Sequence, residues 1–227
     1  MKKIFTVVML FMLSAAVFGQ RVVTKFLGIP VDGSKSAMIQ RLEAKGFKYD
    51  SRYNSLDGEF NGHNVHIYVV TNNNKVWRIM VGDAVSSSET DIKIRFNNLC
   101  RQFQNNKKYV PAVEDGFYLS EDENISYEIS VHNKRYEASF YQKATTAKDS
   151  VALDNGCKSY LESNYSQEQL SNMDDEQKAK IAEIVASYMD EQLSQRRVWF
   201  MISKVNTEYM ILMYYDNGFN QSDGEDL

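Results

Sequence analysis

Three paired apolar runs, each folded about an asparagine-containing turn, constrain the fold of this chain most strongly. They span residues 64–81 (NVHIYVVTNNNKVWRIMV), 125–141 (ISYEISVHNKRYEASFY) and 198–215 (VWFMISKVNTEYMILMYY). β-Branched and aromatic residues pack well on a pleated surface, and Asn tolerates the left-handed backbone of a tight turn. Each run is therefore predicted to form a β-hairpin.

A stretch with helical periodicity precedes each hairpin. Ser34 is a suitable N-cap for the first helix, whose end is predicted at Gly46. Ser88 begins the second helix, and Asp174 is the predicted N-cap of the third. The second helix has the clearest apolar stripe, at Ile92, Phe96, Leu99 and Phe103.

This alternation predicts an α+β fold of repeated helix–β-meander units, with about eight mainly antiparallel strands and the helices on one sheet face. Two such units are expected within residues 20–142. A long, Ser- and Asp-rich loop or linker is expected at 143–173. A third helix–hairpin unit should follow at 174–217, and residues 218–227 read as a disordered acidic tail.

The first nineteen residues are typical of a signal peptide. Lys2 and Lys3 precede an apolar core at residues 4–13, and small residues lead to Gly19. A membrane anchor is the alternative, but the apolar core is shorter than the roughly 20 residues that span a bilayer. We therefore expect a periplasmic or secreted protein of 208 residues, without membrane insertion after processing.

The net charge of the chain indicates which classes of partner are unfavourable. The full chain has 26 basic and 30 acidic residues, and loss of Lys2 and Lys3 takes the net charge from −4 to −6. An acidic chain without basic clusters argues against nucleic acid or anionic lipid as the main partner.

Cys100 and Cys157 are the only cysteines in the chain. Export to an oxidising compartment would allow them to form a disulfide. The alternative is that both are unpaired small apolar residues, because Cys100 occupies an apolar helical position.

The residues that usually carry catalysis or metal binding form no recognisable pattern. His63 and His66 are three apart on a predicted strand, so they should face opposite sides and not share a metal. A solvated strand histidine is the simpler interpretation. No nucleophile elbow, metal-binding HExxH or phosphate-binding glycine loop is present. We expect no cofactor, no metal and no enzymatic activity.

Tyrosine and tryptophan side chains on the hairpins suggest a binding surface. Because side chains alternate along a strand, several should point away from the helix-covered face. The binding candidates are Tyr68, His66, Tyr141 and Tyr214. Trp77, together with Ile79 and Val81, is expected to face the core. The alternative for the aromatics is ordinary core packing and cross-strand pairing.

Asp149-Ser150-Val151 lies in the expected long loop. The tripeptide resembles the O-glycosylation sequon of some anaerobic Gram-negative bacteria, which would make Ser150 the modified residue. A chance match in a Ser-rich loop is the alternative.

The segment GIPVDGSKSAMIQRLEAKGF, followed by a β-meander, resembles the tandem modules of the β-lactamase-inhibitor-protein-like fold. It is also similar to small outer-membrane assembly lipoproteins, although the lipid-attachment cysteine of those proteins is absent here. The resemblance covers residues 27–82 and, more loosely, 88–142. The chain as a whole looks like secreted proteins of gut-type anaerobes, which imply no activity.

Together these features favour a secreted or periplasmic, non-catalytic module that binds another protein, either inhibitor-like or envelope-assembly-like. The surfaces expected to bind are the exposed sheet face or the long loop. The alternative is an envelope hydrolase or glycan-acting module whose carboxylates meet on the sheet.

Overall fold

A computed structural model describes residues 21–114, 116–222 and 224. The chain forms two compact units. We call residues 23–143 together with 193–227 the sheet unit, and residues 144–192 the helical unit, which also includes Arg21 and Val22. The predicted signal peptide lies outside the described residues.

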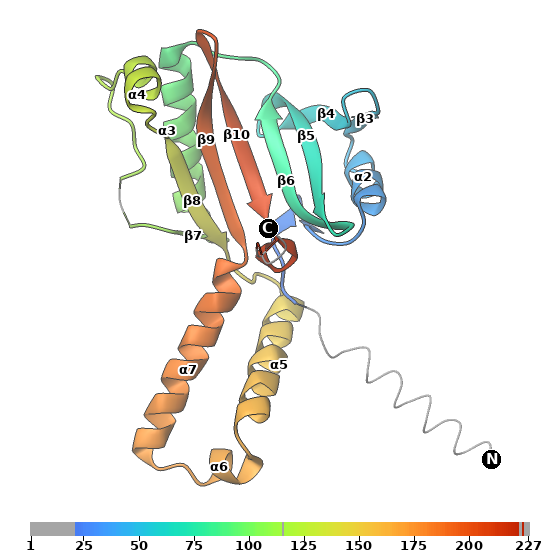
Figure 1. Cartoon of the computed structure of the whole chain (residues 1–227), viewed down its shortest axis with the longest axis vertical. Coiled ribbons are helices and arrows are strands. Elements are labelled where there is room, and N and C mark those ends of the chain that lie inside the picture. The colour runs from blue at the N-terminus through green and yellow to red at the C-terminus, as the bar shows by residue number, and fades with distance from the viewer. Residues whose placement is uncertain (1–20, 115, 223, 225–227) are drawn as a thin grey trace, which may run out of the picture. The chain divides into compact units, whose positions relative to one another are not determined.

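The sheet unit contains one eight-stranded antiparallel sheet (Figure 1). Its strands, in spatial order, are β3 (Lys48–Asp50), β4 (Ser55–Phe60), β5 (His63–Asn72), β6 (Lys75–Asp83), β10 (Glu208–Asp216), β9 (Arg197–Val205), β8 (Glu137–Gln142) and β7 (Tyr109–Pro111). A separate two-stranded ladder joins β1 (Lys25–Phe26) to β2 (Ile29–Pro30). The predicted α+β class with about eight antiparallel strands is confirmed.

The sheet has two halves that meet where β6 pairs with β10. In the first half, helix α2 (Lys35–Glu43) precedes β3 to β6. In the second half, α3 (Glu89–Asn105) precedes β7 to β10, and the helical unit is inserted between β8 and β9. The helix and hairpin expected at 174–217 are present as α7 (Asp175–Ser194), β9 and β10, but most of α7 lies in the helical unit and the hairpin completes the second half of the sheet. A sequence repeat between the halves stays a prediction.

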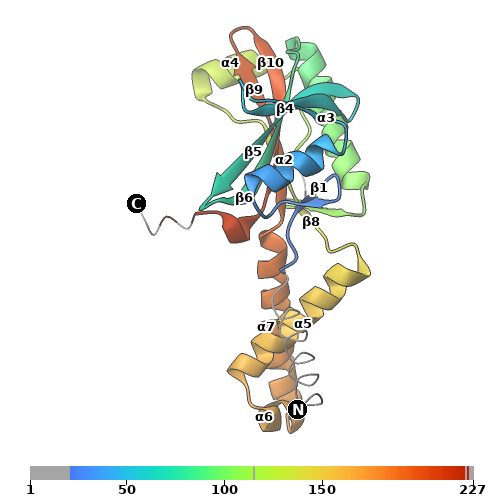
Figure 2. The same cartoon turned by 90° about the vertical axis from the view of Figure 1, so that its right-hand side faces the viewer.

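Helices α2 and α3 begin at the predicted caps. The Ser34 hydroxyl accepts a hydrogen bond from the Ala37 amide, and the Ser88 hydroxyl accepts one from the Asp91 amide. Gly46 follows α2 with a φ of +100°, a backbone conformation that glycine adopts readily. Both helices bury their apolar stripes on the same core as the inward side chains of the strands. Figure 2 shows where α2 and α3 run along the sheet.

The first arm of the predicted second hairpin is a helix, α4 (Ile125–His132). The Asn124 side chain caps its N terminus by accepting from the Tyr127 amide, and Asn133 ends it in the left-handed conformation at φ +52°. Ile125 is fully buried, and Ile129, four residues later, packs against the core. The i, i+4 spacing of the two isoleucines and the two caps therefore favour a helix here, although the alternating pattern predicted a strand.

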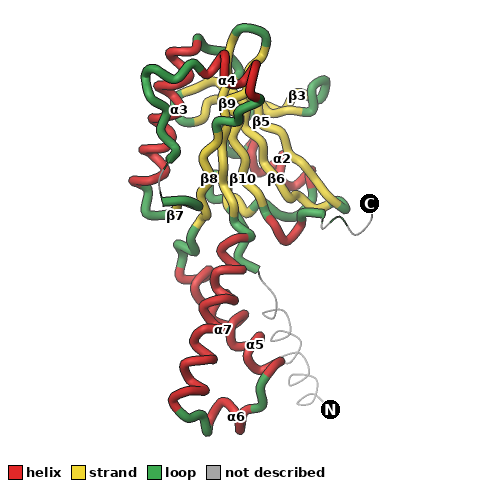
Figure 3. Tube along the Cα trace, turned by 60° about the vertical axis from the view of Figure 1, so that its left-hand side comes forward, coloured by secondary structure: helices red, strands yellow, loops and turns green. Residues whose placement is uncertain are grey.

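The predicted loop at 143–173 was also wrong, because this stretch is mainly helical (Figure 3). It contains α5 (Ala147–Asn164) and α6 (Gln167–Ser171), and α7 (Asp175–Ser194) follows. The Thr146 hydroxyl caps α5, and Ser166 with Gln169 forms a capping box at α6. Ser150 is exposed on the first turn of α5 instead of lying in a loop.

Trp77 and the C-terminal tail also differ from their predicted states. Trp77 is half-buried and lies outside the core, because the pairing of β5 with β6 shifts between Val70 and Thr71 and leaves Trp77 as the extra residue of a bulge. The tail at 218–227 begins with a short 3₁₀ helix, η1 (Gly218–Asn220). The Asn220 side-chain amide donates to the Val76 carbonyl over 2.9 Å, so this part of the tail is ordered.

Cys100 and Cys157 are free thiols, and they belong to different units. Cys100 is fully buried against the core, and burial raises the pKa of its thiol to about 12. The predicted disulfide is therefore absent from the structure, and Cys100 serves as a small apolar core residue.

The core prediction concerns Phe200, which is fully buried and has ring centroids 5.2 Å from Phe96 and 5.5 Å from Phe103. We expect Phe200→Ala to lower the free energy of unfolding by about 3–5 kcal/mol through lost burial and the cavity left behind. Val205→Ala, at an exposed position on the same strand, should change it by no more than about 0.5 kcal/mol in urea melts. If both substitutions lowered the free energy of unfolding equally, Phe200 would not have the core role assigned to it.

Candidate binding face

The sheet face opposite α2 and α3, here called the open face, carries the most distinctive group of side chains. Strand alternation and register bring them into rows that cross the sheet. The central row pairs Tyr68 with Met80, Met80 with Tyr214, Tyr214 with Trp199, and Trp199 with Ser139. The open face therefore combines side chains from both halves of the sheet.

An aromatic and ionic cluster lies at the centre of this face. The rings of Trp199 and Tyr214 stack with centroids 4.1 Å apart and planes 16° from parallel. The Arg78 guanidinium lies 4.8 Å from the centre of the Tyr214 ring and 4.2 Å from that of Trp77. These contacts leave Trp199 and Tyr214 only 9% exposed each, and burial raises the pKa of the Tyr214 phenol.

Asp216 holds this cluster together. Its carboxylate accepts two hydrogen bonds from Arg78, at 2.6 Å from Nε and 2.7 Å from Nη2. The Trp199 indole Nε1 also donates to Asp216, over 2.9 Å. The two-point contact is the strong form of an arginine–carboxylate pair, so it fixes both the guanidinium plane and the indole.

Two further arginines lie near the Trp199 ring, Arg197 at the start of β9 and Arg135 on the side of Met201. The guanidinium carbons of Arg197 and Arg135 lie 5.2 and 6.0 Å from the centre of the Trp199 ring. Arg135 pairs with Glu137 over 2.7 Å, whereas Arg197 donates from Nε to the Ser139 hydroxyl over 2.8 Å. Within the described residues Arg197 has no ion pair, so it contributes a positive charge beside Trp199 that no carboxylate balances.

The remaining part of the open face is apolar and half-buried. It consists of Tyr68, Val70, Met80, Met201, Met210 and Leu212. Leu212 lies opposite Met201 on one side and Gly82 on the other. Methionine side chains are flexible and polarisable, so a surface that contains three of them can adapt to different apolar contacts.

The structure brings all four predicted binding residues to the open face. His66 and Tyr68 lie on β5, Tyr141 on β8 and Tyr214 on β10. Tyr68, His66 and Tyr141 are half-buried, whereas Tyr214 is covered by its cluster. His66 is not isolated, because its Nδ1 lies 2.7 Å from the Asp57 carboxylate.

Sequence reasoning missed Arg78, Arg197, Trp199 and Asp216 as a group. The pairing of β6 with β10 places Arg78 opposite Asp216, although 138 positions separate them in the chain. The available signal was that Asp216 is a charged residue at the end of an otherwise apolar last strand. A buried strand rarely ends in an unpaired carboxylate, but the sequence did not identify the cation.

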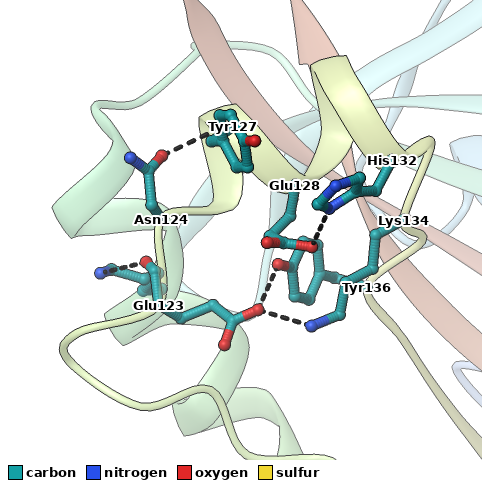
Figure 4. Close-up of polar contacts among 8 residues, drawn as sticks. Glu123, Asn124, Tyr127, Glu128, His132, Lys134 and Tyr136 are labelled. Carbon is teal, nitrogen blue, oxygen red and sulfur yellow. Dashed lines mark hydrogen bonds and ion pairs between the residues drawn. The ribbon is translucent and has the colours of Figure 1, made fainter.

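A second polar cluster lies beside α4 (Figure 4). Its Tyr136 belongs to the buried core and not to the open face. The Glu123 carboxylate accepts hydrogen bonds from the Lys134 ammonium and the Tyr136 hydroxyl, and these donors hold the pKa of Glu123 below its usual range. Burial, and then Glu123, raise the pKa of Tyr136. Lys93 of α3 donates to the Glu121 and Glu123 carbonyls. These hydrogen bonds connect the segment before α4 to α3 and to the residues just before β8.

Neither metal binding nor membrane spanning finds support among the described residues. They contain no group of three or more His, Cys, Asp or Glu side chains arranged to hold a metal ion. No helix in this part of the chain is both long and apolar enough to cross a membrane.

Comparisons with protein-family models, with curated proteins and with solved structures find no match to this chain. The resemblance to inhibitor-like modules and outer-membrane assembly lipoproteins therefore stays a prediction.

The cluster yields a stability prediction. Asp216→Asn removes the charge that balances Arg78, whose side chain is 22% exposed, and should lower the free energy of unfolding by about 2–3 kcal/mol. Asp50→Asn is a matched control, because Asp50 also makes a two-point contact, with Arg52, but that arginine is 78% exposed. In chemical denaturation, a loss at Asp50 as large as that at Asp216 would contradict the role of the cluster.

Proposed function

We propose that this chain is a non-catalytic protein-binding module that acts in the periplasm or outside the cell and binds its partner through the open face. The observation that carries this proposal is the group of half-buried apolar side chains on β5, β6, β10 and β9, on the face opposite the helices. Contiguous apolar side chains on a sheet face are typical of interaction sites.

The composition of the open face suits a protein partner. Tyr68 offers a large, rigid contact with a polar tip, and aromatic residues, Met and Arg are enriched at protein interfaces. Met80, Met201 and Met210 provide adaptable apolar area around it. Trp199 is unsuited to stacking on a sugar ring, because Tyr214 and the neighbouring arginines already cover it. These features favour a protein over a glycan.

The alternative of a hydrolase draws no support from the carboxylates near the sheet. Asp216 is paired with Arg78, Asp83 with Arg95, and Asp57 contacts His66. An acid–base pair of carboxylates requires two such groups that converge on one substrate. Each of these three carboxylates instead contacts its own basic residue.

The resemblance to inhibitor-like and envelope-assembly-like modules agrees with this proposal, as does the expected export. The acidic net charge also favours a protein partner over nucleic acid. The proposed role includes no cofactor and no membrane insertion of the processed chain.

The test is capture from an envelope extract of the producing cells, with open-face variants compared directly. Tyr68→Ala should weaken the captured complex by about 2 kcal/mol, roughly thirtyfold in Kd, while changing the free energy of unfolding little. Tyr53→Ala removes another tyrosine that is 70% exposed, in the turn between β3 and β4, and should leave the affinity unchanged. Equal affinity of both variants and the parent protein would refute binding through the open face.

A further inference from the structure

The helical unit has apolar stripes that it does not bury by itself. On α7 the stripe is formed by Ile181, Ile184, Val185 and Tyr188, at the i, i+3, i+4 and i+7 spacing of one helix face. All four are only half-buried, and none of the 20 residues of α7 is buried. A helix in a globular protein normally derives most of its stability from covering such a stripe.

Helix α5 covers the α7 stripe only in part. The Tyr160 and Tyr188 rings stack with centroids 5.0 Å apart, and a methyl group at Gly156 would come within 2.6 Å of the Tyr188 hydroxyl. The close approach therefore centres on Tyr188. Leu153 is the one buried residue of α5, whereas Val151 is 56% exposed and Tyr160 is 41% exposed. Apolar area on both helices thus remains accessible within this unit.

The helical unit is also strongly acidic. Residues 144–192 contain ten carboxylates and four lysines, whereas the whole chain has a net charge of only −4. Two of the lysines already pair within their own helices, Lys158 with Glu162 and Lys178 with Asp175. The half-buried stripes therefore belong to a unit with an excess of negative charge.

We propose that the helical unit is a second interaction surface, which binds a basic amphipathic helix of a partner protein. The partner's apolar stripe would cover that of α7, and its lysines or arginines would pair with carboxylates of the helical unit. Charge complementarity selects this occupant over a second copy of the chain. Ten carboxylates against four lysines and Arg21 leave five excess negative charges in each unit, so two units repel one another. The same argument disfavours an anionic membrane. This surface is separate from the open face, so each can be tested alone.

The experiment uses the processed full chain and a fluorescent peptide of about 20 residues, built from Leu at helical stripe positions and Lys elsewhere. Fluorescence anisotropy at about 0.15 M salt reports binding. Two control peptides separate the contribution of the apolar stripe from that of the positive charge. One has the same composition in scrambled order, and the other has Glu in place of Lys. Only the peptide that has both the stripe and the lysines should bind with micromolar or tighter affinity.

Protein variants locate the site. Ile184→Gln should weaken binding at least about tenfold, whereas Ala186→Gln, at an exposed position two residues further on, should leave Kd within about twofold. Circular dichroism checks that both variants keep their helix. Glu183→Lys keeps the apolar stripe intact and should still weaken binding several-fold, more than Glu114→Lys, which makes the same charge change in the sheet unit.

Tyr68→Ala should not affect binding of this peptide, which separates this inference from the role of the open face. Equal binding of the scrambled or Glu-containing peptide would overturn the inference, as would equal losses for Ile184→Gln and Ala186→Gln. A concentration-dependent dimer in analytical ultracentrifugation that Ile184→Gln abolishes would assign the surface to a second copy instead.

Discussion

The sheet unit depends on the antiparallel pairing of β6 with β10, which joins two halves that the sequence places far apart. Aspartates fasten this joint at both ends. Asp216 at the end of β10 binds Arg78 directly across on β6, and Asp83 at the end of β6 accepts a hydrogen bond from the Ile211 amide of β10 over 3.0 Å. Asp83 is itself held by Arg95 of α3, so the joint is also tied to the helix layer.

The packing on both faces of the sheet depends on the pairing of β6 with β10. On the inner face, Ile79 and Val81 of β6 meet Met213 and Tyr215 of β10 in one continuous core. On the open face, the same pairing brings Arg78 to Asp216 and Met80 to Tyr214. Without it, neither the aromatic cluster nor the apolar rows would be continuous. The proposed binding surface is therefore a property of the joined sheet and of neither half alone.

Local signals in the sequence predicted the parts of this fold that depend on neighbouring residues. Asn73, Asn74 and Asn206 adopt positive φ in the turns of the β5–β6 and β9–β10 hairpins, as the Asn-containing turns indicated. The same kind of signal was misjudged at α4, where Asn124 and Asn133 act as helix caps. Thr146 and Ser166 likewise cap helices in a stretch whose polar composition favoured a loop.

Features set by distant pairing could not be predicted. A strand sequence does not specify its non-local neighbour, so Arg78 and Asp216 could not be connected in advance. Tyr68 and His66 were placed on the correct face because strict alternation holds along β5 up to Val70. Trp77 was misplaced because a single extra residue at the bulge reverses the alternation.

We infer that the pairing of β6 with β10 makes the sheet a single cooperative structure. Native-state amide hydrogen exchange tests it directly, because it reports the free energy of opening for each strand. The inner amides of β5, β6, β10 and β9 should exchange with closely similar free energies, equal to that of global unfolding. Opening of β9 and β10 at a free energy several kcal/mol below that of β5 and β6 would show that the halves unfold separately and would contradict the claim.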